Sequence, residues 1–268
     1  MKKLIFVTLL PLYFLVWGAQ RELPHWRDQF FPPPAPVPVL KIVGGYGQKL
    51  IGFAYFSKAA VFLGRPIPGK DPNVYANNLA LTYDAVTRLF PEFIDGYYHA
   101  QSSLAHISPE YAVRANDILK NGCRVLPNNL VLPFFVGFNY FHYMNKPEKA
   151  AEVFGELAMK PGAPTWFGHL SSILAAQGGS LYGGRMTLRV ILSTEKDENL
   201  RIRYKQSIAR FDKAIAVFEA AQAFERDHGI FPSNLEQLVP GYLSGLPDLG
   251  DNIVFQWEPP VLRLVRAK

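Results

Sequence analysis

Apolar residues recur every three or four positions along much of the chain, which is the spacing of amphipathic helices. The pattern is clearest between residues 197 and 227, where one long helix is predicted. Its apolar face consists of Ile208, Phe211, Ile215, Phe218 and Phe224. Two further helices are expected at residues 166–176 and 181–192, and residues 134–143 carry aromatic side chains on every side, as is typical of a buried helix. The fold is therefore expected to be mainly α.

The pattern changes near the C-terminus, where two short segments are rich in β-branched and aromatic residues. Residues 253–257 and 261–265 are separated by the sequence Glu-Pro-Pro at 258–260, which predicts a β-hairpin. Gly229 follows the long helix and suits the left-handed conformation that ends many helices. We therefore expect residues 196–268 to form a small unit of one long helix plus a hairpin.

Small and large residues alternate with a regular period in the middle of the chain. Ala80, Ala115 and Ala150 are spaced by 35 residues, and large apolar residues follow two of them by four positions, at Leu119 and Phe154. In stacked helical pairs, a small residue lets the neighbouring helix approach, and a bulky residue one turn later fills the groove. The spacing therefore predicts helical repeats.

These spacings resemble the tetratricopeptide repeat (TPR). The unit that matches best has Gly137 and Tyr140 in its first helix, Ala150 and Phe154 in its second, and Pro161 at its end. The resemblance implies a TPR-like α-solenoid over residues 43–195. It implies an architecture more than a function, because repeats of this kind serve many partners.

The tail of the chain resembles the major pseudopilin of bacterial type II secretion systems over about residues 205–265. The matched positions are His228, Gly229, Phe231, Pro232, Leu235, Leu238, Val239, Leu246 and Pro247. The N-terminal helix of a pseudopilin continues directly into this region, whereas here the repeats intervene, so a polymerising pilin is not expected. The whole order of segments is similar to an uncharacterised family of envelope-anchored TPR proteins from Gram-negative bacteria. This resemblance implies no assigned chemistry.

The start of the chain has the composition of an export signal. Lys2 and Lys3 precede an uncharged apolar run from residue 4 to residue 19. A helix of these 16 residues is about 24 Å long, against a hydrocarbon core of about 30 Å. Residues 1–19 are therefore either an uncleaved membrane anchor, which we favour, or a cleaved signal peptide. An anchor places the protein in the bacterial inner membrane with its body in the periplasm.

A proline-rich segment, residues 20–42, comes next. Five prolines lie between residues 32 and 38, and such runs adopt an extended polyproline conformation. We expect a stiff stalk that holds the body away from the bilayer, and the alternative is a ligand for a proline-recognition domain.

Composition and motifs bound the possible chemistry. The chain has 268 residues, and its 28 Lys and Arg against 22 Asp and Glu leave a net charge of +6, too small to indicate a nucleic-acid-binding protein. Cys123 is the single cysteine, so neither an internal disulfide nor a thiolate zinc cluster is possible. The histidines lack a metal-binding spacing. No cofactor, no metal site and no enzymatic activity is expected.

The positive charge is concentrated in one stripe. Between Arg185 and Lys213 there are eight basic residues against four acidic ones. Ion pairs along a solvated helix face would explain the stripe, and so would binding to anionic lipid or to an acidic partner. The sequence leaves both interpretations open.

These observations favour a non-enzymatic, membrane-anchored scaffold that binds other proteins outside the cytoplasm, in envelope assembly or secretion. Its membrane contact is expected through residues 4–19. The alternative is a structural or accessory subunit of a type IV pilus or type II secretion-like machine. The aromatic helix can present one face to a concave groove, which makes six residues candidates for binding a partner there. They are Tyr98, Gln101, Ser102, Phe135, Asn139 and His142.

Overall fold

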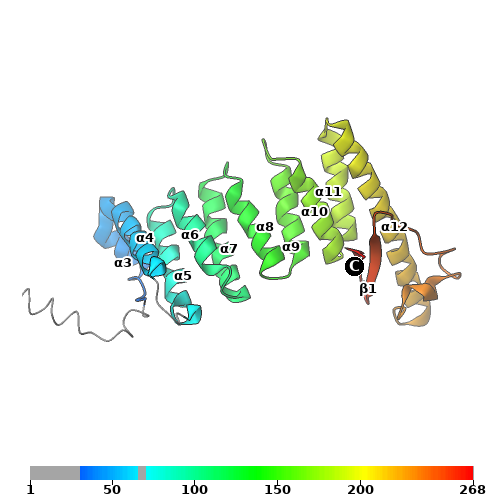
Figure 1. Cartoon of the computed structure of the whole chain (residues 1–268), viewed down its shortest axis with the longest axis horizontal. Coiled ribbons are helices and arrows are strands. Elements are labelled where there is room, and N and C mark those ends of the chain that lie inside the picture. The colour runs from blue at the N-terminus through cyan, green and yellow to red at the C-terminus, as the bar shows by residue number, and fades with distance from the viewer. Residues whose placement is uncertain (1–30, 66–70, 268) are drawn as a thin grey trace, which may run out of the picture. The chain divides into compact units, whose positions relative to one another are not determined.

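The computed structural model describes residues 31–65 and 71–267, and in these ranges the chain is mainly helical with a two-stranded antiparallel sheet near its end (Figure 1). The chain divides into two compact units, with the boundary between Gly96 and Tyr97. The expected anchor or signal peptide, residues 1–19, lies outside the described residues. Within the described ranges, no helix combines the length and the apolar character that crossing a membrane requires.

The described part of the first unit is helical almost throughout. It contains α3 (Val37–Gly44), the 3-10 turn η1 (Gly45–Gly47), α4 (Gln48–Gly64), α5 (Pro72–Leu89) and the start of α6 (Ile94–Leu104). Leu40 of α3 forms a buried cluster with Ala85 and Leu89 of α5.

The stalk expected over residues 20–42 does not extend through residue 42, because α3 begins at Val37. Pro38 falls in the first turn of this helix, where the N–H group that proline lacks has no helical partner to lose. Phe31 is also buried, with its ring centroid 4.8 Å from that of Phe62. The segment that the prolines mark therefore folds onto the first unit from Phe31 onward, while its earlier residues lie outside the described ranges.

The second unit continues the helices and ends in the sheet. After the remainder of α6 it contains α7 (Pro109–Val125), α8 (Val131–His142), α9 (Pro147–Ala158), α10 (Trp166–Gly178), α11 (Leu181–Thr194), α12 (Glu198–His228), the 3-10 turn η2 (Leu235–Leu238), β1 (Ile253–Glu258) and β2 (Val261–Arg266). From α7 to α12, each helix packs against the next one along the chain. The predicted helices at 166–176 and 181–192 are confirmed and are each two residues longer.

Close packing between helices uses the small residues that the sequence marks. A Cβ atom added at Gly137 of α8 would lie 2.8 Å from the Phe154 ring of α9, so only glycine lets that ring lie against the α8 backbone. Ala150 and Phe154 are both buried. Residues 137, 150 and 154, which the sequence marks as small or large, therefore all lie in the packed interior of this helix pair.

The aromatic helix is less buried than its composition indicates. Leu132, Val136 and Asn139 form its buried side, whereas Phe141 and His142 are exposed. Its neighbours along the chain, α7 and α9, leave these two side chains uncovered.

The long helix and the hairpin form as predicted. The side chain of Asp197 accepts hydrogen bonds from the first backbone N–H groups of α12, and Gly229 ends the helix in the left-handed conformation with φ of 75°. In the sheet, Phe255 lies opposite Leu264, and the Trp257 Nε1 donates to the Pro232 carbonyl at 2.7 Å. This bond ties the hairpin to the segment that follows α12.

Candidate functional site: a basic pocket beside the hairpin

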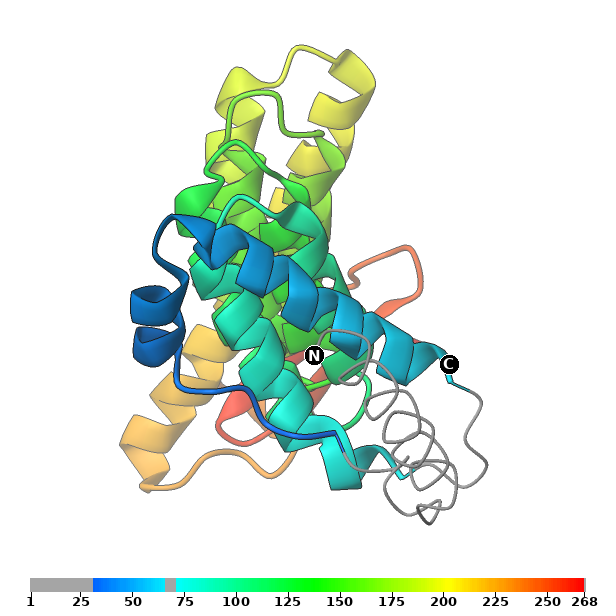
Figure 2. The ribbon, with the colours of Figure 1, turned by 90° about the vertical axis from the view of Figure 1, so that its left-hand side faces the viewer.

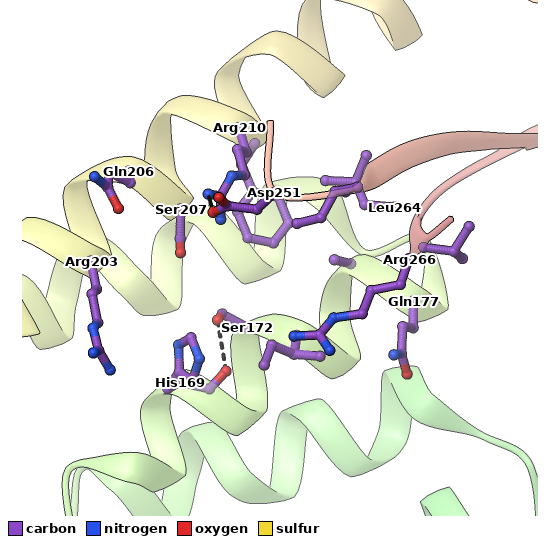
Figure 3. Close-up of a pocket in the computed structure, with 15 residues that line it drawn as sticks. His169, Ser172, Gln177, Arg203, Gln206, Ser207, Arg210, Asp251, Leu264 and Arg266 are labelled. Atoms are coloured by element: carbon purple, nitrogen blue, oxygen red, sulfur yellow. Dashed lines mark hydrogen bonds and ion pairs between the residues drawn. The ribbon is translucent and has the colours of Figure 1, made fainter. Parts of the chain in front are cut away.

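A pocket of about 460 Å³ lies in the second unit between α10, α12 and the hairpin (Figure 3). Helical spacing explains its walls. Arg203, Ser207 and Arg210 are four and three residues apart on α12, so they lie on one face of that helix. His169 and Ser172 are three residues apart on α10, so they lie on one face of that helix, and both line the pocket.

The hairpin closes the pocket. Leu264 and Arg266 reach it from β2, and Asp251 reaches it from the loop before β1. This loop is fastened to α12, because Arg210 pairs with the Asp251 carboxylate and its Nε donates to the Leu249 carbonyl at 3.1 Å. Lys213 adds a hydrogen bond of 2.6 Å to the Asp248 carbonyl. The wall is therefore held by charge-assisted hydrogen bonds, which are the stronger kind.

Positive charge predominates in the pocket. Arg203, Arg210 and Arg266 line it together with a single carboxylate, that of Asp251, which is already paired with Arg210. Neither Arg203 nor Arg266 has a carboxylate within ion-pair distance among the described residues. In the view of Figure 3, these two side chains extend toward His169 and Ser172 from opposite sides. Two guanidinium groups are thus available to an anion.

His169 reports this environment through its pKa. Partial burial lowers the pKa of the imidazole below its ordinary value, and the positive charges of Arg203 and Arg210 lower it further. The imidazole is therefore neutral at pH 7, and it can donate or accept a hydrogen bond. An anion bound between the arginines would offset their effect and raise this pKa.

The pocket has the chemistry of anion binding. The planar guanidinium group binds carboxylates and phosphates with two parallel hydrogen bonds, and the amide groups of Gln177 and Gln206 add neutral donors. Ile173 contributes an apolar wall and is 41% exposed, so a bound group could contact it as well. Over the ranges that the structure describes, no group of three or more His, Cys, Asp or Glu side chains is placed to hold a metal ion.

Two of the six predicted groove residues lie in the interior instead. The side-chain amides of Gln101 and Asn139 exchange two hydrogen bonds, of 2.8 and 2.6 Å, and Asn139 also donates to Asn116 Oδ1 at 2.8 Å. All three side chains are buried, and they come from α6, α8 and α7. They join three helices and are not exposed to a partner.

The other four predicted residues are at least partly exposed but do not converge on one site. Tyr98 and Phe135 form an aromatic pair, with ring centroids 6.0 Å apart. The hydroxyl of exposed Ser102 donates to the His99 carbonyl, and exposed His142 stacks on Phe138. None of the six predicted residues lines the basic pocket.

The sequence pattern singled out some of the residues that line the pocket. Arg203 and Arg210 belong to the basic stripe, but His169 and Arg266 lie far from it along the chain. Elsewhere in the stripe, Arg185 and Arg189 pair with Asp212, which fits the solvated face with ion pairs. The stripe therefore divides into a solvated part and a part that enters the pocket.

Comparisons of the chain with protein-family models, with curated proteins and with solved structures found no match. By its fold and its pocket, the chain is a mainly helical protein with a basic pocket between two helices and a C-terminal β-hairpin.

Proposed function

We propose that the chain is a non-enzymatic scaffold with TPR-like repeats, and that its basic pocket binds an acidic side chain of a partner protein. One observation carries the proposal, namely that Arg203 and Arg266 line a pocket without a carboxylate partner among the described residues. An arginine without a carboxylate partner can form a new ion pair with an incoming anion. A bidentate guanidinium–carboxylate pair is stronger than a neutral hydrogen bond, so this ion pair would contribute strongly to binding.

A protein partner suits the surroundings of the pocket. Arginine next to exposed apolar side chains is characteristic of protein interfaces, and both Ile173 in the pocket and Ile202 beside Arg203 are more than 40% exposed. The acidic side chain would enter the pocket while neighbouring apolar residues of the partner cover these isoleucines.

The proposed location follows from the two lysines and the apolar run at the start of the chain. The scaffold would be held at the bacterial inner membrane by residues 4–19 with its body in the periplasm, and it would serve envelope assembly or secretion. The second candidate is an accessory subunit of a type IV pilus or type II secretion-like machine, favoured by the pseudopilin-like sequence of α12, η2 and the hairpin.

Site-specific photo-crosslinking in cells tests the proposal. A photoreactive residue at Gln206 lies in the pocket, whereas one at Lys205 is exposed on the same helix and does not line it. We expect Gln206 to give a defined adduct with another protein that Lys205 does not give. The charge reversal Arg203→Glu with Arg266→Glu should remove the adduct.

Three results would contradict the proposal. They are identical adducts at both positions, no adduct at Gln206, and an adduct that survives the charge reversal. A matched reversal at Arg226, which is exposed on α12 outside the pocket, should leave the adduct unchanged. Adducts formed mainly with pilus or secretion components would favour the second candidate over the first.

A further inference from the structure

The first unit carries a row of exposed apolar side chains that its own core does not cover. The row runs along α3, η1 and the start of α4 and consists of Val39, Ile42, Val43, Tyr46, Leu50 and Phe53. The exposed fractions are 83% for Ile42, 76% for Val43 and 76% for Leu50, and Tyr46 is fully exposed. Large apolar side chains that gather in this way mark a contact surface.

The opposite side of the same segment is already buried. Val37, Leu40, Ile51 and Tyr55 pack on the core with α5. In α3, Ile42 and Val43 follow Val39 by three and four positions, and in α4 Phe53 follows Leu50 by three, so each helix carries exposed apolar side chains on one side. The segment is therefore apolar on both sides, and a segment of this kind is normally covered on both.

The charged residues of this segment indicate which kind of partner suits the second face. From Gln29 to Lys70 the chain contains no Asp or Glu, although it contains Lys41, Lys49, Lys58, Arg65 and Lys70. Apolar side chains accompanied by bases without acids are the composition of segments that lie on anionic membranes. Within this segment the row is accompanied by basic residues alone.

The lysines flank the row and are accessible. Lys41 and Lys49 are exposed, and they precede Ile42 and Leu50 in the chain. Lys49 forms an ion pair of 3.1 Å with Glu92, with both side chains more than half exposed, so phosphate groups can compete for it. These charges would face the lipid headgroups while the apolar row enters the boundary with the acyl chains.

The position of the row in the chain agrees with contact to a membrane. The apolar run that ends at Ala19 is separated from Val37 by 17 residues. Such a stretch spans at most about 60 Å, at roughly 3.5 Å per residue. If the run enters a bilayer, it holds the first unit near the same surface and raises the local concentration of lipid around the row.

We propose that the α3–η1–α4 row lies in the headgroup region of an anionic bilayer. Figure 2 shows α3 and α4 meeting at an angle, with η1 at the corner between them. Tyr46 is in η1, and tyrosine is enriched at membrane interfaces because its ring is apolar and its hydroxyl is polar. The row thus contacts the membrane through a different unit from the basic pocket, and it rests on the proposed function only where residues 4–19 hold that unit near the bilayer.

Spin labelling of the full chain tests this contact. Cys123 is replaced by alanine, and single cysteines are introduced as Ile42→Cys, Tyr46→Cys or Leu50→Cys for labelling. The controls are Met186→Cys and Ile230→Cys, because these apolar side chains are 67% and 68% exposed and lie outside the row. Each protein is reconstituted into vesicles of three parts phosphatidylcholine to one part phosphatidylglycerol, and the accessibility of the label to oxygen and to a water-soluble nickel complex is compared.

We expect labels at 42, 46 and 50 to be several times more accessible to oxygen than to nickel, and the control labels to show the reverse. Vesicles of phosphatidylcholine alone should weaken this preference, because they lack the anionic headgroups that attract the lysines, and an unchanged preference would contradict the role of anionic lipid. Equal nickel accessibility at all five positions would overturn the proposal, because the row would then face water. Protection of 42, 46 and 50 from both reagents would also overturn it, because protein and not lipid would cover the row.

Discussion

The buried amide network gives the sharpest test of how the second unit is held together. Replacing Asn139 by alanine removes the side chain that bonds to both Gln101 and Asn116. All three residues are at most 7% exposed, so water cannot replace the lost bonds without entering the helix interface. The variant should therefore be strongly destabilised.

The expected magnitude follows from the groups left without partners. A buried polar group that loses its hydrogen bond costs roughly 1–3 kcal/mol. Asn139→Ala leaves the Gln101 amide and Asn116 Oδ1 in this state, so the free energy of unfolding should fall by about 2–5 kcal/mol. His142→Ala is the matched control on the same helix, and its exposed side chain should change the stability by less than about 0.5 kcal/mol.

Urea denaturation followed by circular dichroism measures both variants. The double variant Gln101→Leu with Asn139→Leu adds a check, because removing both partners leaves fewer unpaired groups than removing one. It should be more stable than the two single leucine variants predict by addition, by about 0.5–3 kcal/mol. The reasoning is refuted if Asn139→Ala shifts the urea midpoint no more than His142→Ala, since Asn139 would then be available to a partner.

Three further predictions concern single sites. The pKa of His169, measured by NMR, should lie below its ordinary value and rise in Arg203→Ala. In the native sequence the unfolded chain binds a proton at His169 more readily than the folded protein does. The free energy of unfolding should therefore decrease as the pH falls through about 6.5. Gly137→Ala should cost about 1–3 kcal/mol in urea denaturation, because the new Cβ meets the Phe154 ring. Cys123 should react with iodoacetamide more slowly than free cysteine at pH 8, because burial raises the pKa of its thiol.

Local patterns predicted the elements whose signals lie within their own sequence. The long helix could be located because its apolar face lies within its own sequence and Gly229 follows its last residue. The hairpin could be located because its two strands flank a short turn. Each of these signals is separated by only a few residues from the element that it specifies.

The incorrect expectations depended on partners far away in the chain. Phe31 was assigned to a stalk because nothing nearby indicates its contact with Phe62. Gln101 and Asn139 were assigned to a groove because the aromatic helix was expected to present one face to it, whereas these two side chains bond to each other across 38 residues. The pocket was missed for the same reason, since only folding brings Arg266 to the helix that carries Arg203.

Helix geometry explains why the basic stripe has two roles. Residues two positions apart on an α-helix point in nearly opposite directions, because each residue turns the helix by about 100°. Arg201 accordingly turns toward the end of α11, where its Nη1 donates to the Leu192 and Glu195 carbonyls, and it also pairs with Glu198. Arg203 turns to the pocket instead. The charge count along the sequence does not distinguish these two arginines. In the structure Arg201 stabilises the junction of two helices, whereas Arg203 lines the pocket.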